Sequence, residues 1–239
     1  MKKLKNWDHN TWLSSRKYVV SFHSFLKKDI NFHKKIKILD IGCGRGKLIS
    51  FLSKKYQLNH LPIGVDIVNH KVKSNRIKFI KVDAIKFLKN SNEKFDLIIL
   101  KQSIHFFTKK QIRFIVNNIK KKLNDNGKIV VCTLNSENIS IPTFRLFQKK
   151  LGISLKKDKL KIFLLKKILK NYKIRVFKFK VKINKNTYIK MLKKRFISCL
   201  LKLSKKDILN GIKEIKRKYN KKIIFNDALL CLIYNYKKK

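Results

Sequence analysis

The chain has 239 residues, of which 44% are hydrophobic and 11% aromatic, and this is ordinary for one globular α/β domain with a substantial core. Its 62 basic and 13 acidic residues give a formal net charge of +49, which will attract polyanions whatever the evolved role. We expect neither a membrane protein nor a secreted one, because no apolar run reaches membrane-spanning length and the first residues lack a signal-peptide core.

The charge has two interpretations. Only eight of the basic residues are arginine, and the lysines are spread along the whole chain together with abundant Ile and Asn. This distribution favours a nucleotide-composition bias in the gene, because phosphate recognition favours the planar fork of arginine. The alternative is a surface that binds nucleic acid.

The four cysteines are scattered without a C-x-x-C pair or a histidine cluster. No metal site is readable, and three of the cysteines lie in apolar segments, which predicts a reducing, cytoplasmic environment.

Residues 1–35 are expected to be helical and amphipathic. Their apolar positions are Trp7, Trp12, Leu13, Tyr18, Val19, Phe22 and Phe25. These large side chains could form a lid over a ligand cleft or pack on the edge of a sheet.

The most informative stretch is 36–48, with the sequence IKILDIGCGRGKL. An apolar strand over 36–39 ends at Asp40, glycines follow at every second position, and a helix is predicted over 47–55. Glycine permits positive φ angles and leaves no side chain between backbone and ligand. The first helical turn presents unpaired N–H groups to whatever binds there.

This pattern differs from a dinucleotide-binding loop, which requires G-x-G-x-x-G. Lys47 stands where the third glycine would fall, and the third glycine is Gly46. The carboxylate of Asp40 would repel a pyrophosphate, but it suits a ligand with positive charge. S-adenosylmethionine, which carries an ammonium and a sulfonium group, fits the pattern better than NAD.

Two further predicted strands end at an acid. The strand over 61–67 contains Asp66, which could accept both hydroxyls of a ribose. The strand over 77–84 ends at Asp83, which could accept from an adenine amino group or cap a helix. Three successive acids at carboxyl strand ends indicate one ligand-binding edge of an open α/β sheet.

The middle of the chain continues the alternation of strand and helix. A buried strand over 95–100 leads into a polar loop over 101–107 that carries His105. A helix over 108–123 with Thr108 as its N-cap, a turn over 124–127 and a strand over 128–133 follow. This alternation predicts a parallel sheet with right-handed crossovers.

After residue 134 the pattern changes. Strands are predicted over 174–183 and 227–236, and the last of the seven strands is expected to pair antiparallel. The predicted helices cover 143–150, 157–170, 185–203 and 205–219, the last with Ser204 as its cap.

The motifs together resemble class I S-adenosylmethionine-dependent methyltransferases over about 36–133. Leu39–Gly46 is similar to their first motif, Gly64–Asp66 to the second and Val82–Ala84 to the third. Phe95–Ile98 and the turn Leu123–Ile129 resemble the later motifs, although Asn126 and Ile67 depart from the residues common there. The resemblance implies a Rossmann-like, seven-stranded, mostly parallel sheet with helices on both faces, an N-terminal helical lid and a helical insertion before the last strand.

The resemblance also implies a cofactor site. The methionine part would bind at Gly42–Gly44, the ribose at Asp66, and the adenine beside Asp83 and Ala84. The residues expected to bind S-adenosylmethionine are Asp40, Gly42, Cys43, Gly44, Gly46, Asp66, Ile67, Asp83, Ala84 and Lys101. We expect a single domain over 1–239, divided into a cap (1–35), a cofactor-binding half (36–133) and a substrate-side half (134–239).

The leading hypothesis for the acceptor is a small molecule, because of the three strand-end acids and the long insertion over 135–203. The stretch Tyr188–Ser198, with Trp7 and Trp12, also resembles small-molecule methyltransferases of the type 11 sort. An oxygen acceptor needs a general base, and His105 is the candidate, with a packing role as its alternative. The charge favours an RNA methyltransferase instead, but the N-P-P-Y type loop and the paired catalytic cysteines of such enzymes are missing. A binding module without turnover is disfavoured by the three intact strand-end acids.

Overall fold

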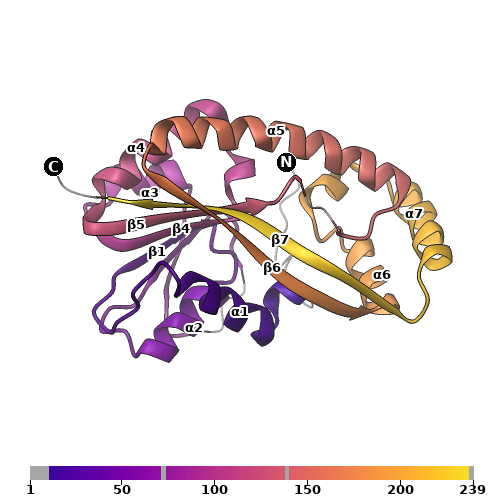
Figure 1. Ribbon diagram of the computed structural model, residues 1–239, viewed down its shortest axis with the longest axis horizontal. Coiled ribbons are helices and arrows are strands. Elements are labelled where there is room, and N and C mark those ends of the chain that lie inside the picture. Colours follow the sequence, from indigo (N-terminus) through magenta and orange to yellow (C-terminus); the bar gives the residue numbers. More distant parts are fainter. Residues whose placement is uncertain (1–10, 71–73, 138–139, 237–239) are drawn as a thin grey trace.

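The computed structural model describes residues 11–70, 74–137 and 140–236 (Figure 1). Their seven strands form one sheet in the order β3-β2-β1-β4-β5-β7-β6. Strands β1 to β5 are parallel, and β7 runs antiparallel to both β5 and β6. The strands are β1 (Ile38–Ile41), β2 (Ile63–Asp66), β3 (Lys78–Lys81), β4 (Phe95–Lys101), β5 (Leu123–Leu134), β6 (Tyr172–Asn184) and β7 (Lys222–Asn235). The predicted seven-stranded, mostly parallel sheet is confirmed.

Helices cover both faces of this sheet (Figure 1). On one face α1 (Arg16–Leu26) and α2 (Lys47–Tyr56) pack against side chains such as Leu97 and Ile99 of β4. On the other face α3 (Ala84–Asn90), α4 (Lys109–Lys121) and the second half of α5 (Arg145–Leu169) pack against the alternate side chains, such as Ile98 and Leu100. The central strands are therefore apolar on both faces, which explains their continuous hydrophobic runs.

Five helices of the described chain begin at side-chain caps, and three of these caps are at residues singled out in the sequence. Thr108 accepts from the N–H of Gln111 and so caps α4, and Ser204 accepts from the N–H of Asp207 and caps α7 (Lys205–Lys218). Both are reciprocal capping boxes, and both caps were predicted from the sequence. Asp83 caps α3 through its side chain, which accepts from the N–H groups of Ile85 and Lys86.

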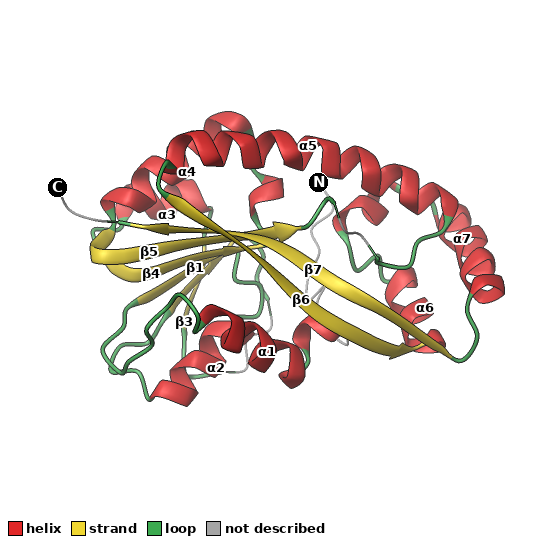
Figure 2. Cartoon of the chain, in the orientation of Figure 1, coloured by secondary structure: helices red, strands yellow, loops and turns green. Residues whose placement is uncertain are grey.

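Strands β6 and β7 form a ribbon that extends beyond the parallel strands (Figure 2). They pair along their whole length, from Tyr172 opposite Tyr234 to Asn184 opposite Lys222. Strand β5 reaches only the second half of β7, where Leu134 lies opposite Leu229. The first half of β7 therefore projects past the carboxyl edge of the parallel sheet, where α6 (Lys185–Lys193), a 3-10 turn (Ser198–Lys202) and α7 surround it.

The helices expected over 143–150 and 157–170 are one continuous helix, α5, so the predicted break is wrong. Its buried side chains recur every three or four residues, which is the period of a single amphipathic helix. They are Phe147, Leu151, Leu155, Asp158, Ile162, Leu165 and Leu169. Gly152 lies on the exposed face of the helix, so it does not interrupt the buried stripe.

The helix expected over 185–203 is also too long, because α6 ends at Lys193. Arg195 takes a left-handed φ of 52°, and its guanidinium Nη2 donates to the carbonyl of Leu203 at 2.9 Å. This turn redirects the chain so that Phe196 packs against Trp12.

The N-terminal segment is helical only in part. A 3-10 turn (Trp12–Ser14) precedes α1, and residues 27–37 are irregular. Tyr18 and Phe22 of α1 pack edge-on against Phe177 of β6, which is the sheet-edge alternative for these aromatics. Trp7 lies outside the described residues.

Candidate functional site

The loop between β1 and α2 is left-handed at three glycines. The φ angles of Gly42, Gly44 and Gly46 are 76°, 57° and 64°. A Cβ atom at Gly42 would lie 2.4 Å from the Cβ of Ser103, so both space and backbone angle require glycine there. The loop is held against β2, because the N–H of Gly42 donates to the carbonyl of Val65 at 2.8 Å.

Asp66, at the end of β2, fixes this loop from the other side. Its Oδ2 accepts from the N–H of Gly44 and its Oδ1 from the N–H of Val68, both at 2.9 Å. His70 Nε2 lies 3.6 Å from Oδ1. Burial alone would raise the pKa of Asp66, but the hydrogen bonds from His70, Val68 and Gly44 outweigh it and lower the pKa. Asp66 is therefore a fixed carboxylate at neutral pH.

Asp40 is a buried carboxyl group behind the loop. It is 4% exposed, and its Oδ1 is buried without a hydrogen-bond partner in the described structure. Burial, reinforced by the charge of Asp66 and opposed by Lys101, raises the pKa of Asp40 to about 7. A buried carboxyl group with an unused oxygen is stabilised by any cation that approaches it.

Asp83 lies at the end of β3 and caps α3. Its Oδ1 accepts from the N–H of Ile85 at 2.8 Å and from that of Lys86 at 3.4 Å. The helix-cap role that the sequence left open for Asp83 is thus present. Its neighbour Ala84 is buried and begins α3.

A cavity of about 440 Å³ opens at the carboxyl ends of the parallel strands. Seven of the eleven sequence-predicted site residues line it, and they are Gly42, Asp66, Ile67, Asp83, Ala84, Lys101 and His105. Cys43, Gly44 and Gly46 lie in the loop behind Gly42, and Asp40 is buried beneath it. Cys43 fills the space beside Gly64, where an added Cβ would lie 2.8 Å from the Cys43 Sγ.

Lys101 ends β4, and it is the single lysine that the described residues contribute to the cavity lining. Its Nζ lies 5.2 Å from the ring centre of Tyr18 and 5.5 Å from that of Phe22. These cation–π contacts hold the ammonium against α1.

His105 lies in the 3-10 turn (Ile104–Phe106) that follows β4, with its ring centre 4.0 Å from that of Phe106 and the two rings tilted by 42°. Burial, reinforced by the charge of Lys161, lowers the pKa of His105 to about 4. The Nζ of Lys161 also donates to the main-chain carbonyl of His105. At neutral pH the imidazole is therefore uncharged, and the lowered pKa makes it a weak base.

The other side of the cavity comes from the second half of the chain. Sequence reasoning missed two carboxylates there, Asp158 of α5 and Asp227 of β7. Both could have been noticed in the sequence, because Asp158 is the single acid of a lysine-rich helix and Asp227 stands directly before the apolar run of β7. Trp12 reaches the same cavity, and its indole Nε1 donates to Asp227 Oδ2 at 2.9 Å.

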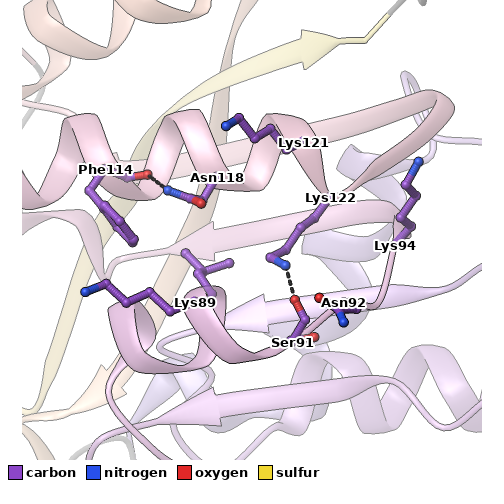
Figure 3. A pocket seen from close by; sticks show the side chains of 9 residues that line it. Lys89, Ser91, Asn92, Lys94, Phe114, Asn118, Lys121 and Lys122 are labelled. Atoms are coloured by element: carbon purple, nitrogen blue, oxygen red, sulfur yellow. Dashed lines mark hydrogen bonds between the residues drawn. The ribbon is translucent and has the colours of Figure 1, made fainter.

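A second hollow lies at the opposite, amino edge of β4 and β5, between α3 and α4 (Figure 3). Lysines surround it, and Lys122 closes it by donating from its Nζ to the carbonyl of Ser91. Asn118 donates to the carbonyl of Phe114 at 2.8 Å. None of the predicted site residues lines this hollow.

This geometry agrees with the comparison with protein families. A family model described as a methyltransferase domain matches residues 32–161, more than half of the chain, and the chain belongs to this family. The protein is a class I S-adenosylmethionine-dependent methyltransferase, and its cofactor is S-adenosylmethionine.

Solved structures share the fold at low sequence identity. A methyltransferase from an antibiotic biosynthesis pathway of Anabaena variabilis is 16% identical, with a TM-score of 0.59 over 89% of this chain and 96% of the other. An S-adenosylmethionine-dependent methyltransferase from Archaeoglobus fulgidus is 21% identical, with a TM-score of 0.51 over 93% and 95%. The plantazolicin methyltransferase BpumL, solved with a pentazolic desmethylPZN analog and SAH, is 16% identical, with a TM-score of 0.52 over 98% and 89%.

No curated protein matches the sequence significantly. Among the residues that the structure describes, no helix has the length and apolar character needed to cross a membrane.

Proposed function

We propose that the protein transfers the methyl group of S-adenosylmethionine to a small-molecule acceptor bound in the same cavity. The observation that supports this proposal is the continuity of that cavity. It extends from the glycine loop and strand ends of the cofactor-binding half (36–133) to walls supplied by the cap (1–35) and the substrate-side half (134–239). BpumL, with the same fold, was solved with a pentazolic desmethylPZN analog and SAH.

The residues present fit the cofactor. Gly42 has no side chain, and so avoids a clash with Ser103. The Oδ1 of Asp40, at the end of the strand that leads into the same loop, has no hydrogen-bond partner in the described structure. Asp40 would attract the ammonium group, and Asp66 keeps lone pairs for ribose hydroxyls beside its two backbone bonds. Asp83 and Ala84 would border the adenine, and Lys101 would pair with the carboxylate.

When bound, S-adenosylmethionine supplies a methyl group whose bond to sulfur breaks as the acceptor's nucleophilic atom bonds to carbon. The chain's part is to align acceptor and methyl group and to exclude water. His105 would take the proton that an oxygen acceptor loses, since its imidazole is neutral and lines the cavity. Retention of full turnover by His105→Ala would assign His105 to packing against Phe106.

Cofactor binding by Asp66 is tested with Asp66→Ala. We expect calorimetry to show a loss of affinity for S-adenosylhomocysteine of at least roughly tenfold, because charged hydrogen bonds are lost and the loop is released. Asp125→Ala is the matched control, since Asp125 is an exposed acid in the bulged start of β5. Unchanged affinity in Asp66→Ala would contradict the assigned ribose site.

An RNA acceptor is the second candidate, and the net charge of +49 favours it. The cavity itself is against it, because four of its lining residues are aspartates, which repel phosphate. A methyl-transfer assay against separated metabolite and RNA pools distinguishes the two. We expect labelled product in the metabolite pool, and label in RNA alone would reverse the assignment.

A further inference from the structure

The cavity lining has a charge opposite to that of the rest of the chain. Basic residues outnumber acidic ones by 62 to 13 in the whole chain, yet among the residues that the structure describes the lining contains four aspartates and one lysine, beside two histidines. Asp66 and Asp83 belong to the proposed cofactor edge, whereas Asp158 and Asp227 face it from the substrate side. A general bias toward lysine does not account for two carboxylates at these buried positions.

Asp227 is positioned by the topology of the sheet. Strand β7 runs antiparallel, so its early residues reach the carboxyl edge at which β1 to β5 end. Asp227 lies opposite Phe179 of β6, two residues before β7 begins to pair with β5 at Leu229. Its carboxylate therefore lies on the cofactor-binding edge although it belongs to the substrate-side half.

The carboxylate of Asp227 is a buried acid in the cavity lining. It is 1% exposed, and its Oδ2 accepts from Trp12. Among the described residues it forms no ion pair. Burial raises the pKa of Asp227, and the hydrogen bond from Trp12, the charge of Lys101 and the nearby hydroxyl of Tyr18 oppose this shift. Lys101 is held over the rings of Tyr18 and Phe22 instead of pairing with it.

Asp158 of α5 adds a second substrate-side acid to the cavity lining. It is 8% exposed, and its Oδ1 lies 3.8 Å from the Nζ of Lys161. That ammonium also donates to the carbonyl of His105, so Asp158 shares its counter-ion.

The surface that accompanies these acids is apolar and aromatic. Trp12 packs edge-on against Phe196 at 5.4 Å and against Phe225 at 5.0 Å. Trp12 and Phe196 line the cavity together with Leu151 and Leu155. A carboxylate beside aromatic rings is an environment that stabilises an alkylammonium group, through charge and through cation–π attraction.

We propose that the acceptor is a cationic small molecule whose protonated alkylamine group binds Asp227 and whose apolar part packs against Trp12 and Phe196. The ammonium nitrogen has no lone pair, so it anchors the molecule, and a different nucleophilic atom of the same molecule forms the new bond to the methyl carbon as the bond from that carbon to sulfur breaks. Asp158 contributes a weaker attraction from α5. This inference rests on the proposed function and names the acceptor class for the same cavity.

The test compares matched pairs of ligands that differ in charge. Phenethylamine is paired with phenylethanol, tryptamine with tryptophol, and hexylamine with hexanol, and each is titrated by calorimetry into protein saturated with S-adenosylhomocysteine near neutral pH. We expect at least one amine to bind roughly tenfold or more tightly than its alcohol, the scale of a charge-assisted hydrogen bond. If no amine binds more tightly than its alcohol, the proposal is overturned.

Two variants assign the preference to its residue. Asp227→Asn removes the charge while an amide oxygen can still accept from Trp12, and it should abolish the preference for the amine. Asp125→Asn removes an exposed acid and should leave the preference unchanged. An amine preference that survives in Asp227→Asn would refute the role of this carboxylate.

The affinity for S-adenosylhomocysteine, measured first in every variant, separates this inference from the proposed function. Failure to bind S-adenosylhomocysteine contradicts the cofactor site. Normal binding without an amine preference contradicts only the acceptor class.

Discussion

At the scale of single residues, we expect Asp40 to couple cofactor binding to pH. Its raised pKa means that the folded protein without cofactor keeps a proton that the unfolded chain releases between about pH 4 and 7. Ionising Asp40 therefore destabilises the cofactor-free protein as the pH rises through this window. A cation next to the carboxylate reverses the effect, because it stabilises the charged form.

We therefore predict that the affinity for S-adenosylmethionine rises with pH up to about 7 and then levels off. The slope contributed by Asp40 approaches about tenfold per pH unit well below that value. Calorimetry across this range, in buffers that differ in ionisation enthalpy, measures both affinity and proton release. Asp40→Asn should lose this component, and an identical pH profile in both proteins would contradict the coupling.

The glycines provide a matched pair of substitutions. Gly42→Ala places a Cβ 2.4 Å from that of Ser103 at a φ of 76°, so we expect destabilisation of about 1–3 kcal/mol and weaker cofactor binding. Gly152→Ala meets no atom within 4 Å on the exposed face of α5, and should stabilise the protein by about 0.5–1 kcal/mol. Denaturant unfolding measures both changes, and equal effects would contradict the steric argument.

The sequence made the residues of the glycine loop and strand ends predictable, because their roles follow from short local patterns. Gly42, Asp66 and Asp83 each lie directly after a recognisable apolar run. Asp227 and Asp158 were missed since their positions depend on long-range pairing. Asp227 reaches the cavity because β7 is antiparallel, and Asp158 reaches it because α5 is a single helix.

At the scale of elements, strands were easier to predict than the helices of the second half. Buried strands give unbroken apolar runs, whereas lysines in every helix blur the boundaries. A glycine and a cluster of lysines led to the prediction of two helices, whereas α5 is one helix with a continuous stripe of buried side chains. Helix α6 was extended too far, because the left-handed turn at Arg195 carries no glycine to indicate it.

The capping boxes allow a test of stability apart from the site. Ser204→Ala removes the side-chain cap of α7 and should lower the free energy of unfolding by about 1 kcal/mol. Helix α7 packs against α5 and α6 outside the cavity lining, so S-adenosylhomocysteine should bind as before. Ser204→Thr, which retains a hydroxyl, should recover most of the lost stability, and a weaker cofactor affinity in Ser204→Ala would link α7 to the site.

At the scale of the whole molecule, charge is separated between surface and cavity. The chain as a whole is rich in lysine and should attract polyanions, whereas the described charged residues of the cavity lining are four aspartates and one lysine, beside two histidines. Retention of polyanions depends on counterion release and falls steeply with salt. Salt screens the interactions between charges inside the cavity much less.

We therefore predict that retention of bulk RNA falls by orders of magnitude between about 50 and 200 mM salt. Turnover of a small-molecule acceptor should change little over the same range. Filter binding and a methyl-transfer assay on the same samples test both statements. Parallel losses of binding and turnover would instead indicate that RNA is the acceptor.

The segment between the end of β5 and the middle of β7 has its two ends side by side. The N–H of Asn135 donates to the carbonyl of Ala228 at 2.9 Å, so the chain leaves β5, supplies α5, β6, α6 and α7, and returns beside β5 at adjacent residues. Such a segment has the geometry of an exchangeable cassette, whose replacement leaves the glycine loop and the strand ends in place. A new acceptor specificity can then arise by recombination at two neighbouring positions, without a new cofactor site.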